Sequence, residues 1–137
     1  MTGMPKDIYI VEPPGAAPPG GHYSHGVGYG DLLFVSGQLG IRPNGSHTAD
    51  CEFEEQARQA LRNVLTVLEA AGSGPDDLLK VTAYVVDVAN WPRLNKVYAE
   101  AMGQARPARA VVPVPALHYG YLIEIDAVAV RRKGKSE

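Results

Sequence analysis

The chain has 137 residues, the length of one domain, and its composition of 45% hydrophobic and 20% charged residues excludes a disordered protein. Thirteen Lys and Arg against fifteen Asp and Glu give a net charge of −2. This charge argues against nucleic acid or an anionic membrane as a partner, because both are bound through clustered cations. The single cysteine, Cys51, excludes an intramolecular disulfide and a cysteine-rich zinc site.

The distribution of prolines, glycines and charges predicts one domain over residues 1–137. Residues 1–21 are expected to hold a first strand, at 7–12, followed by a loop with four prolines and three glycines. Residues 131–137, four of them Lys or Arg, are expected to form a polar tail. No segment approaches the roughly 20 apolar residues of a membrane helix, and the N-terminus has no secretory pattern, so we expect a cytoplasmic protein.

A hairpin and a long helix are predicted next. Residues 26–37 are typical of two strands that turn near Gly30 and Asp31. Between Asp50, the expected N-cap, and Ala71, apolar residues recur at three- and four-residue steps, which predicts an amphipathic helix. Gly72 supplies the stop signal for this helix.

The second half of the chain predicts a strand, a helix and two more strands. Residues 80–88 are β-rich and mostly apolar, which indicates a central strand. Asn90 caps the following helix, and Pro92 occupies its first turn, where a missing N–H costs nothing. Two last strands are predicted at 108–114 and 121–130. The order β-β-β-α-β-α-β-β predicts an α+β fold with both helices packed on one face of a mixed sheet.

Strict alternation divides the last predicted strand into two faces. One face is apolar, and the other carries Leu122, Val128 and Val130 among two carboxylates, Glu124 and Asp126. No other segment of the chain remains to cover this second face. We therefore expect a symmetric oligomer in which another copy closes over it.

Arg109 opens an apolar strand, and a buried guanidinium needs an anionic partner. One interpretation is an internal salt bridge to Glu124 or Asp126. The other is a fork for a ligand carboxylate, with Glu124 left free for proton transfer. The chemistry of the residues favours neither. His22 and His25 lack a second cluster of ligands at matching spacing, so no metal site is expected.

A series of short motifs follows in order between about Tyr23 and Val130. The motifs are Tyr23-Ser24, Phe34-Val35-Ser36-Gly37-Gln38, Gln56-Ala57-Arg58-Gln59-Ala60-Leu61, Leu68-Glu69-Ala70-Ala71-Gly72, Asp76-Asp77-Leu78-Leu79-Lys80-Val81-Thr82, Leu94-Asn95-Lys96-Val97-Tyr98, Pro107-Ala108-Arg109 and Ile123-Glu124-Ile125-Asp126-Ala127-Val128-Ala129. Through this ordered signature the chain resembles the RidA/YjgF family, the reactive-intermediate deaminases also labelled endoribonuclease L-PSP-like.

The resemblance implies a chorismate-mutase-like α+β fold and a homotrimer with three clefts between its subunits. It also implies a hydrolase of the 2-iminobutanoate/2-iminopropanoate deaminase type. Such enzymes convert reactive enamines and imines, for example 2-aminoacrylate, to 2-keto acids and ammonia. They use no cofactor, and their partner is a small substrate that bears a carboxylate.

By matching position, the resemblance implies that Arg109 binds the substrate carboxylate and that Glu124 positions and activates the attacking water. An imine carbon is already electrophilic, so orientation, a carboxylate anchor and one base are enough. The charge of Arg109 is expected to keep nearby Glu124 ionised. The implied substrate-binding residues are Tyr23, Ser36, Asn95, Arg109 and Val111, the last through its backbone.

Several positions around the expected cleft depart from the family pattern. Ala110 and Val111 follow the arginine where Ser or Cys is usual, His25 stands where Gln is common, and the 118–121 loop differs. Two alternatives therefore stay open: a pathway-specific deaminase or hydrolase of another carboxylated substrate, and a non-catalytic trimer that binds small molecules. The net charge of −2 argues against the ribonuclease label.

Overall fold

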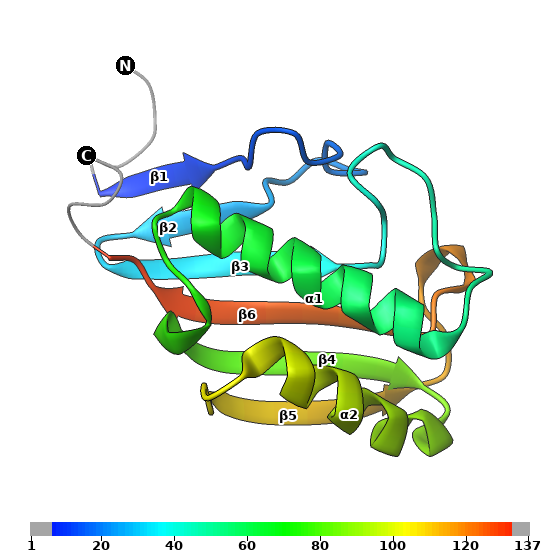
Figure 1. Ribbon diagram of the computed structural model, residues 1–137. Helices are drawn as coiled ribbons and strands as arrows, with labels where there is room; N and C mark the ends of the chain where they lie inside the picture. Colours follow the sequence, from blue (N-terminus) through cyan, green and yellow to red (C-terminus); the bar gives the residue numbers. More distant parts are fainter. Residues whose placement is uncertain (1–6, 133–137) are drawn as a thin grey trace.

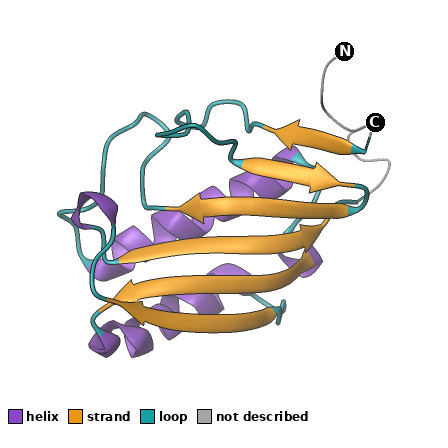
Figure 2. Cartoon of the chain, turned by 180° about the vertical axis from the view of Figure 1, so that it is seen from behind, coloured by secondary structure: helices purple, strands orange, loops and turns teal. Residues whose placement is uncertain are grey.

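Six strands form one sheet, and two helices lie across one of its faces (Figures 1 and 2). The computed structural model describes residues 7–132. The helices are α1 (Phe53–Ala70) and α2 (Trp91–Met102). The strands are β1 (Ile8–Val11), β2 (Gly26–Tyr29), β3 (Leu32–Gln38), β4 (Leu78–Val86), β5 (Ala108–Val114) and β6 (Ile123–Val130).

The strand order in the sheet is β1-β2-β3-β6-β4-β5. Neighbouring strands are antiparallel except β4 and β5, which are parallel and are connected through α2. The last strand of the chain therefore lies inside the sheet, between β3 and β4, while β1 and β5 form the two edges. The predicted order of elements and the predicted α+β arrangement, with both helices on one face of a mixed sheet, are confirmed.

Helix α1 begins later than predicted, and the prediction that Asp50 caps it is wrong. The N-cap is Glu52, whose backbone is extended and whose side chain makes no capping hydrogen bond. Asp50 lies instead in a turn, in which the Cys51 N–H donates to the Thr48 carbonyl at 2.8 Å. The helix ends, as predicted, just before Gly72, which has a φ of 80°.

Strand β4 lies two residues earlier than the predicted 80–88 segment. Asp87 adopts a φ of 73°, which ends the strand and begins a short 3₁₀ turn, η2 (Val88–Asn90). Asn90 is the N-cap of α2, as predicted, but its side-chain amide donates to the Val86 carbonyl at 2.9 Å rather than capping the helix. It thereby ties the start of α2 to the end of β4.

The core lies between the helices and the inner face of the sheet. The predicted alternation of the last strand is confirmed, because Ile123 and Ile125 are fully buried there. Gln56 of α1 is also fully buried. Its Oε1 accepts from the Leu122 N–H at 2.9 Å, and its Nε2 donates at 3.1 Å to the Ala49 and Cys51 carbonyls. This single side chain joins the segment before α1 to the start of β6.

The outer face of the sheet is free of helices (Figure 2). Phe34 and Leu32 of β3 are 45% and 38% exposed on it, next to Val128 and Val130 of β6. Val128 and Val130 thus lie on the open face, as predicted. Leu122 does not belong to this face: it precedes β6 and packs against the core.

Arg131 and Arg132, which we placed in a polar tail, contact the fold instead. The Arg131 guanidinium lies 4.4 Å from the centre of the Tyr9 ring, and Arg132 forms an ion pair with the buried Asp77. The rest of the expected tail, residues 133–137, lies outside the described residues. Within residues 7–132, no helix combines the length and the apolar character needed to span a bilayer.

Candidate active site

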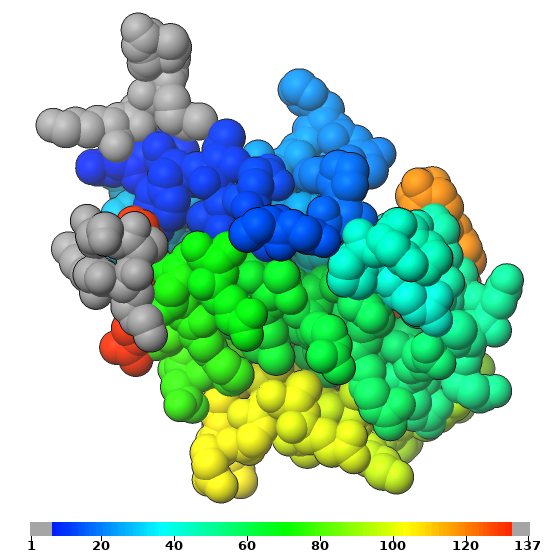
Figure 3. All heavy atoms as spheres, turned by 45° about the horizontal axis from the view of Figure 1, so that its top comes forward, coloured from blue at the N-terminus to red at the C-terminus, as the bar shows by residue number. Residues whose placement is uncertain are grey.

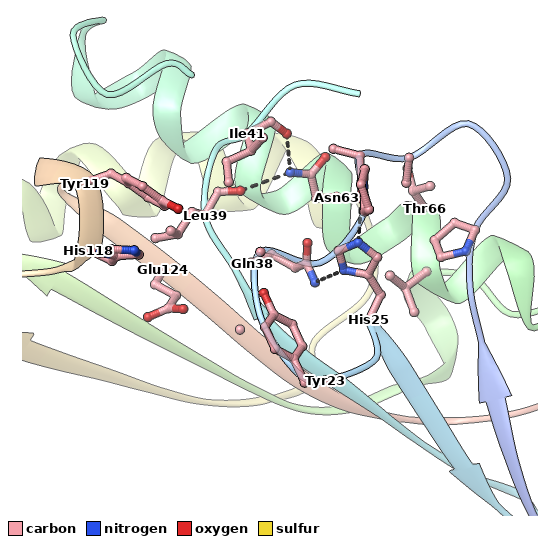
Figure 4. Close-up of a pocket in the computed structure, with 17 residues that line it drawn as sticks. Tyr23, His25, Gln38, Leu39, Ile41, Asn63, Thr66, His118, Tyr119 and Glu124 are labelled. Atoms are coloured by element: carbon pink, nitrogen blue, oxygen red, sulfur yellow. Dashed lines mark hydrogen bonds between the residues drawn. The ribbon is translucent and has the colours of Figure 1, made fainter. Parts of the chain in front are cut away.

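A pocket of about 200 Å³ lies between the proline-rich loop, α1 and one end of the sheet. Figure 3 shows the N-terminal segment, in blue, lying along α1, in green. In Figure 4, Glu124 and His118 lie at one end of the pocket and Thr66 at the other, with Tyr23 and His25 between them. The loop that was predicted to be irregular therefore forms one wall of this pocket.

Glu124 projects from the outer face of β6 toward an irregularity in the neighbouring strand. The register between β3 and β6 shifts between Val35 and Gln38, which places Gly37 against the carboxylate. A Cβ at Gly37 would lie 2.6 Å from Glu124 Oε2, closer than real side chains approach. The absence of a side chain at Gly37 therefore makes room for the Glu124 carboxylate.

Burial raises the pKa of Glu124 above its ordinary value of 4.5, and the negative charge of Asp126 raises this pKa further. His118, at the mouth of the pocket, acts in the opposite direction and lowers the pKa of Glu124. No salt bridge among residues 7–132 involves Glu124. The carboxylate is thus half-buried and forms no ion pair among these residues, an environment in which a glutamate gains basicity.

Two of the expected substrate-binding residues, Ser36 and Tyr23, lie near Glu124. They differ in what their side chains contact. Tyr23 lines the pocket and its side chain is about half exposed. Ser36, one residue before Gly37, donates its hydroxyl to the Ser24 carbonyl at 2.6 Å. Its hydrogen bond therefore holds the loop that carries Tyr23.

A second pair of hydrogen bonds fastens the proline-rich loop. His25 Nε2 lies 2.7 Å from the Ala17 carbonyl, and His25 Nδ1 lies 3.3 Å from Gln38 Nε2. Since a carbonyl only accepts and an amide N–H only donates, this arrangement fits the neutral imidazole with its proton on Nε2. The same Gln38 nitrogen donates to the Ser36 carbonyl at 3.1 Å, so loop, histidine and strand form one connected network.

The other expected site residues lie on the opposite side of the sheet. Arg109 is paired with Val81, whose side chain is buried beneath the helices, and its guanidinium lies 4.9 Å from the centre of the Tyr98 ring of α2. Val111 lies two residues further along the same edge strand, and Asn95 is exposed on α2. These residues form a second group, at the β5–α2 edge of the molecule.

Two expectations about Arg109 are therefore wrong for a single chain. The guanidinium is exposed rather than buried, and none of the salt bridges within residues 7–132 joins it to Glu124 or Asp126. It also does not hold Glu124 ionised, because the pKa of Glu124 is raised and the two side chains project from opposite faces of the sheet. The alternation of apolar residues is too weak along β5 to reveal this orientation.

The pocket residue Asn63 was missed from the sequence, whereas Tyr119 belongs to the 118–121 loop that was expected around the cleft. Asn63 of α1 donates from Nδ2 to the Leu39 carbonyl at 3.0 Å and to the Ile41 carbonyl at 2.9 Å, which fixes the segment after β3 over the helix. Tyr119 lines the pocket mouth with an unusual φ of 62°. Asn63 could have been found as a polar residue within the helical pattern. The positive φ of Tyr119 could not have been predicted from the sequence.

The described residues contain no group of three or more His, Cys, Asp or Glu side chains arranged to hold a metal ion. The arrangement instead offers a half-buried carboxylate, a pocket and hydrogen-bonded walls. It can orient a small molecule and move a proton at Glu124.

Comparison with known proteins identifies chains that are related to this one in sequence. Residues 14–131 match the family model described as Endoribonuclease L-PSP. A RutC family protein of Pyrococcus horikoshii is 38% identical over 92% of this chain and 98% of its own length. The human 2-iminobutanoate/2-iminopropanoate deaminase is 34% identical over 90% of this chain and 88% of the human protein.

Solved structures agree with the sequence matches. Escherichia coli TdcF with bound serine superimposes with a TM-score of 0.83 at 32% identity, covering 90% of this chain and 99% of TdcF. A Thermotoga maritima structure gives a TM-score of 0.85 at 37% identity, covering 90% of this chain and 98% of the other. The fold described above is thus shared along nearly the whole length of these relatives.

Proposed function

The chain belongs to the endoribonuclease L-PSP family, the RidA/YjgF proteins, and from that premise we propose that it is a cofactor-free deaminase of reactive imines and enamines. The family includes proteins named as imine deaminases, such as the human relative. The observation that carries the proposal is the half-buried carboxylate of Glu124, which faces the pocket and forms no ion pair among the described residues.

The proposed reaction converts a 2-imino acid and water to a 2-oxo acid and ammonia. The Glu124 carboxylate takes a proton from a water molecule as the water oxygen bonds to the imine carbon. The electron pair of the C=N bond moves to nitrogen, which takes a proton from the solvent. The resulting carbinolamine then forms a C=O bond while its C–N bond breaks. The protonated Glu124 returns its proton to the departing nitrogen, and the hydroxyl proton is released, so the carboxylate is restored.

The carboxylate of the substrate needs an anchor, and we propose that Arg109 of a second copy supplies it. Arg109 and Glu124 project from opposite faces of the sheet in one chain, so one chain does not bring them to one substrate. The exposed guanidinium at the β5–α2 edge is free to present its planar fork to a carboxylate in a cleft between subunits. Asn95 and Val111, on the same edge, would line that cleft beside Arg109.

The expected assembly is a homotrimer with three such clefts, closed over the outer face of the sheet. Its support here is the exposed apolar surface around Phe34 and Leu32 on a face that no helix covers. A cytoplasmic location is part of the same proposal.

The direct test is an assay with imines generated in place. An amino-acid oxidase acting on several amino acids supplies the imino acids, and their decay is followed with and without the protein. We expect the protein to accelerate decay and to release the 2-oxo acid and ammonia in equal amounts. Decay that is unchanged by the protein for every amino acid tested would reject the proposed activity, and RNA added as a separate substrate should remain intact.

A further inference from the structure

The pocket extends well beyond the space that a small imine occupies. An apolar cavity of about 150 Å³ binds benzene, which has six heavy atoms, so a pocket of about 200 Å³ has room for more than the six heavy atoms of 2-iminopropanoate. The residues that line the pocket run from Glu124 past His25 to Thr66 on α1 (Figure 4). An occupant with its reacting carbon beside Glu124 would send its side chain in this direction.

We call the part of the pocket that runs from Glu124 toward Thr66 the extension, and its walls are mainly hydrocarbon. The proline-rich loop contributes Pro13, Ala16 and Pro18, α1 contributes Val67, and the segment after β3 contributes Leu39. None of the residues that line the pocket is Lys or Arg, and Glu124 is its single carboxylate. The extension therefore favours a neutral, apolar group.

The polar side chains of the extension already have partners within the protein. The Asn63 amide nitrogen donates to two backbone carbonyls, and the Thr66 hydroxyl donates to the Arg62 carbonyl at 2.9 Å. Both ring nitrogens of His25 are also engaged, one with Ala17 and one with Gln38. A polar substrate side chain would have to displace these bonds, whereas an apolar one leaves them intact.

Tyr119 lines the pocket at its Glu124 end, beside His118 (Figure 4). It belongs to the short turn η3 (His118–Gly120), and its ring lies 3.7 Å, centre to centre, from the His118 ring. Its hydroxyl reaches the proline-rich loop, where a Cβ at Gly20 would lie 3.9 Å away. A positive φ at a tyrosine is a strained conformation of the kind that concentrates at ligand sites.

We propose that this extension is the side-chain subsite of the enzyme and that the preferred substrates are imines of amino acids with large aliphatic side chains, such as leucine. The inference rests on the proposed deaminase function and names its substrate class. A reaction that releases branched-chain 2-imino acids would then be the source of the substrate. Discrimination by an apolar pocket amounts to roughly tenfold or more per methylene, so the preference over the alanine imine should be at least tenfold in kcat/KM.

The test compares 4-methyl-2-iminopentanoate with 2-iminopropanoate, generated from leucine and alanine. We expect kcat/KM to be at least about tenfold higher for the leucine imine in the unmodified protein. Thr66→Leu, which fills the far end of the subsite, should lower the leucine-to-alanine ratio about tenfold. Glu69→Leu, at an exposed position of the same helix outside the pocket, is the matched control and should leave the ratio unchanged.

A second measurement, independent of turnover, is calorimetric binding of the product acids. We expect 4-methyl-2-oxopentanoate to bind the unmodified protein at least about tenfold more tightly than pyruvate. Hydrolysis of both imines with equal kcat/KM, or equal binding of both oxo acids, would overturn the subsite and leave the deaminase function standing. Tighter binding of the larger acid without hydrolysis of any imine would support the subsite and reject the deaminase function.

Discussion

The carboxylate of Glu124 lies half-buried on the outer face of β6, where burial and the charge of Asp126 raise its pKa. A carboxyl whose pKa is raised in the folded state favours folding while it is protonated. This contribution is complete below the ordinary pKa of 4.5 that the unfolded chain shows, and it is lost as the pH rises through the raised pKa. At neutral pH the ionised Glu124 therefore opposes folding while it serves as a base.

Glu124→Gln should separate these two effects. Because an amide cannot take a proton, we expect kcat for imine hydrolysis to fall at least a hundredfold while binding of the oxo acid product is retained. The same substitution should raise the melting temperature at neutral pH, and the gain should disappear below about pH 4. Activity assays, calorimetric binding and melts between pH 4 and 8 check this, and a full-rate Glu124→Gln protein would contradict the role of the base.

For Arg109 we expect a substitution to abolish activity and to leave the stability of the fold unchanged. Its guanidinium is exposed over the Tyr98 ring, a contact worth about 0.5–1 kcal/mol, so Arg109→Ala should leave the fold and its melting temperature nearly unchanged. We expect imine hydrolysis to be lost, because the substrate carboxylate loses its planar, bidentate partner. Arg109→Lys should be nearly as inactive. An Arg109→Ala protein that melts early but hydrolyses imines normally would show that the arginine is structural.

At the scale of elements, the irregularity of β3 positions the base. The register shift between Val35 and Gln38 brings the backbone at Gly37 against the Glu124 carboxylate. The atom that an added Cβ would meet first is the end of a flexible side chain, Glu124 Oε2, so the carboxylate rather than the strand is expected to move.

Gly37→Ala should therefore reduce activity with little effect on folding. We expect kcat/KM to fall about tenfold or more, since displacement of a catalytic group by an ångström has large effects on rate. Gly74→Ala is the matched control, because a Cβ there meets nothing within 4 Å. Equal rates for both variants would mean that the position of the Glu124 carboxylate does not limit the reaction.

Local sequence patterns predicted the helices and strands well. They did not predict which segments pack against one another. Alternation along residues 123–130 correctly assigned the buried and open faces of β6, although it misplaced Leu122, which lies before the strand. In β5, the run Val111-Val112-Pro113-Val114 lacks alternation, and the strand pairs in parallel with β4, so the side of the sheet on which Arg109 lies was not readable. The pocket wall at Pro13 and Pro18 also escaped prediction, because it depends on contacts with α1, distant in sequence.

At the scale of the whole molecule, one face of the sheet is packed and the other is open. The helices bury the inner face, whereas Phe34, Leu32 and Val112 leave apolar surface on the face that no helix covers. Surface of this kind is typical of an interface between subunits. The two groups of site residues, around Glu124 and around Arg109, are expected to meet only across such an interface.

The expected assembly has a definite mass. A trimer of 14.7 kDa chains has a mass of about 44 kDa, and we expect light scattering at micromolar concentration to report this value. Phe34→Asp places a charge in the open apolar face and should shift the mass toward that of a monomer, with loss of activity. A mass near 15 kDa for the unmodified protein would exclude the trimer.

The central claim, that one active site combines Glu124 of one subunit with Arg109 of another, is tested most directly by mixing two inactive variants. Glu124→Gln and Arg109→Ala chains are unfolded together, refolded at equal amounts and checked for mixed trimers by native mass spectrometry. Random mixing pairs an intact Glu124 with an intact Arg109 in about one quarter of the clefts, so we expect about one quarter of the activity of the unmodified protein. Mixed trimers that form but remain inactive would contradict the claim.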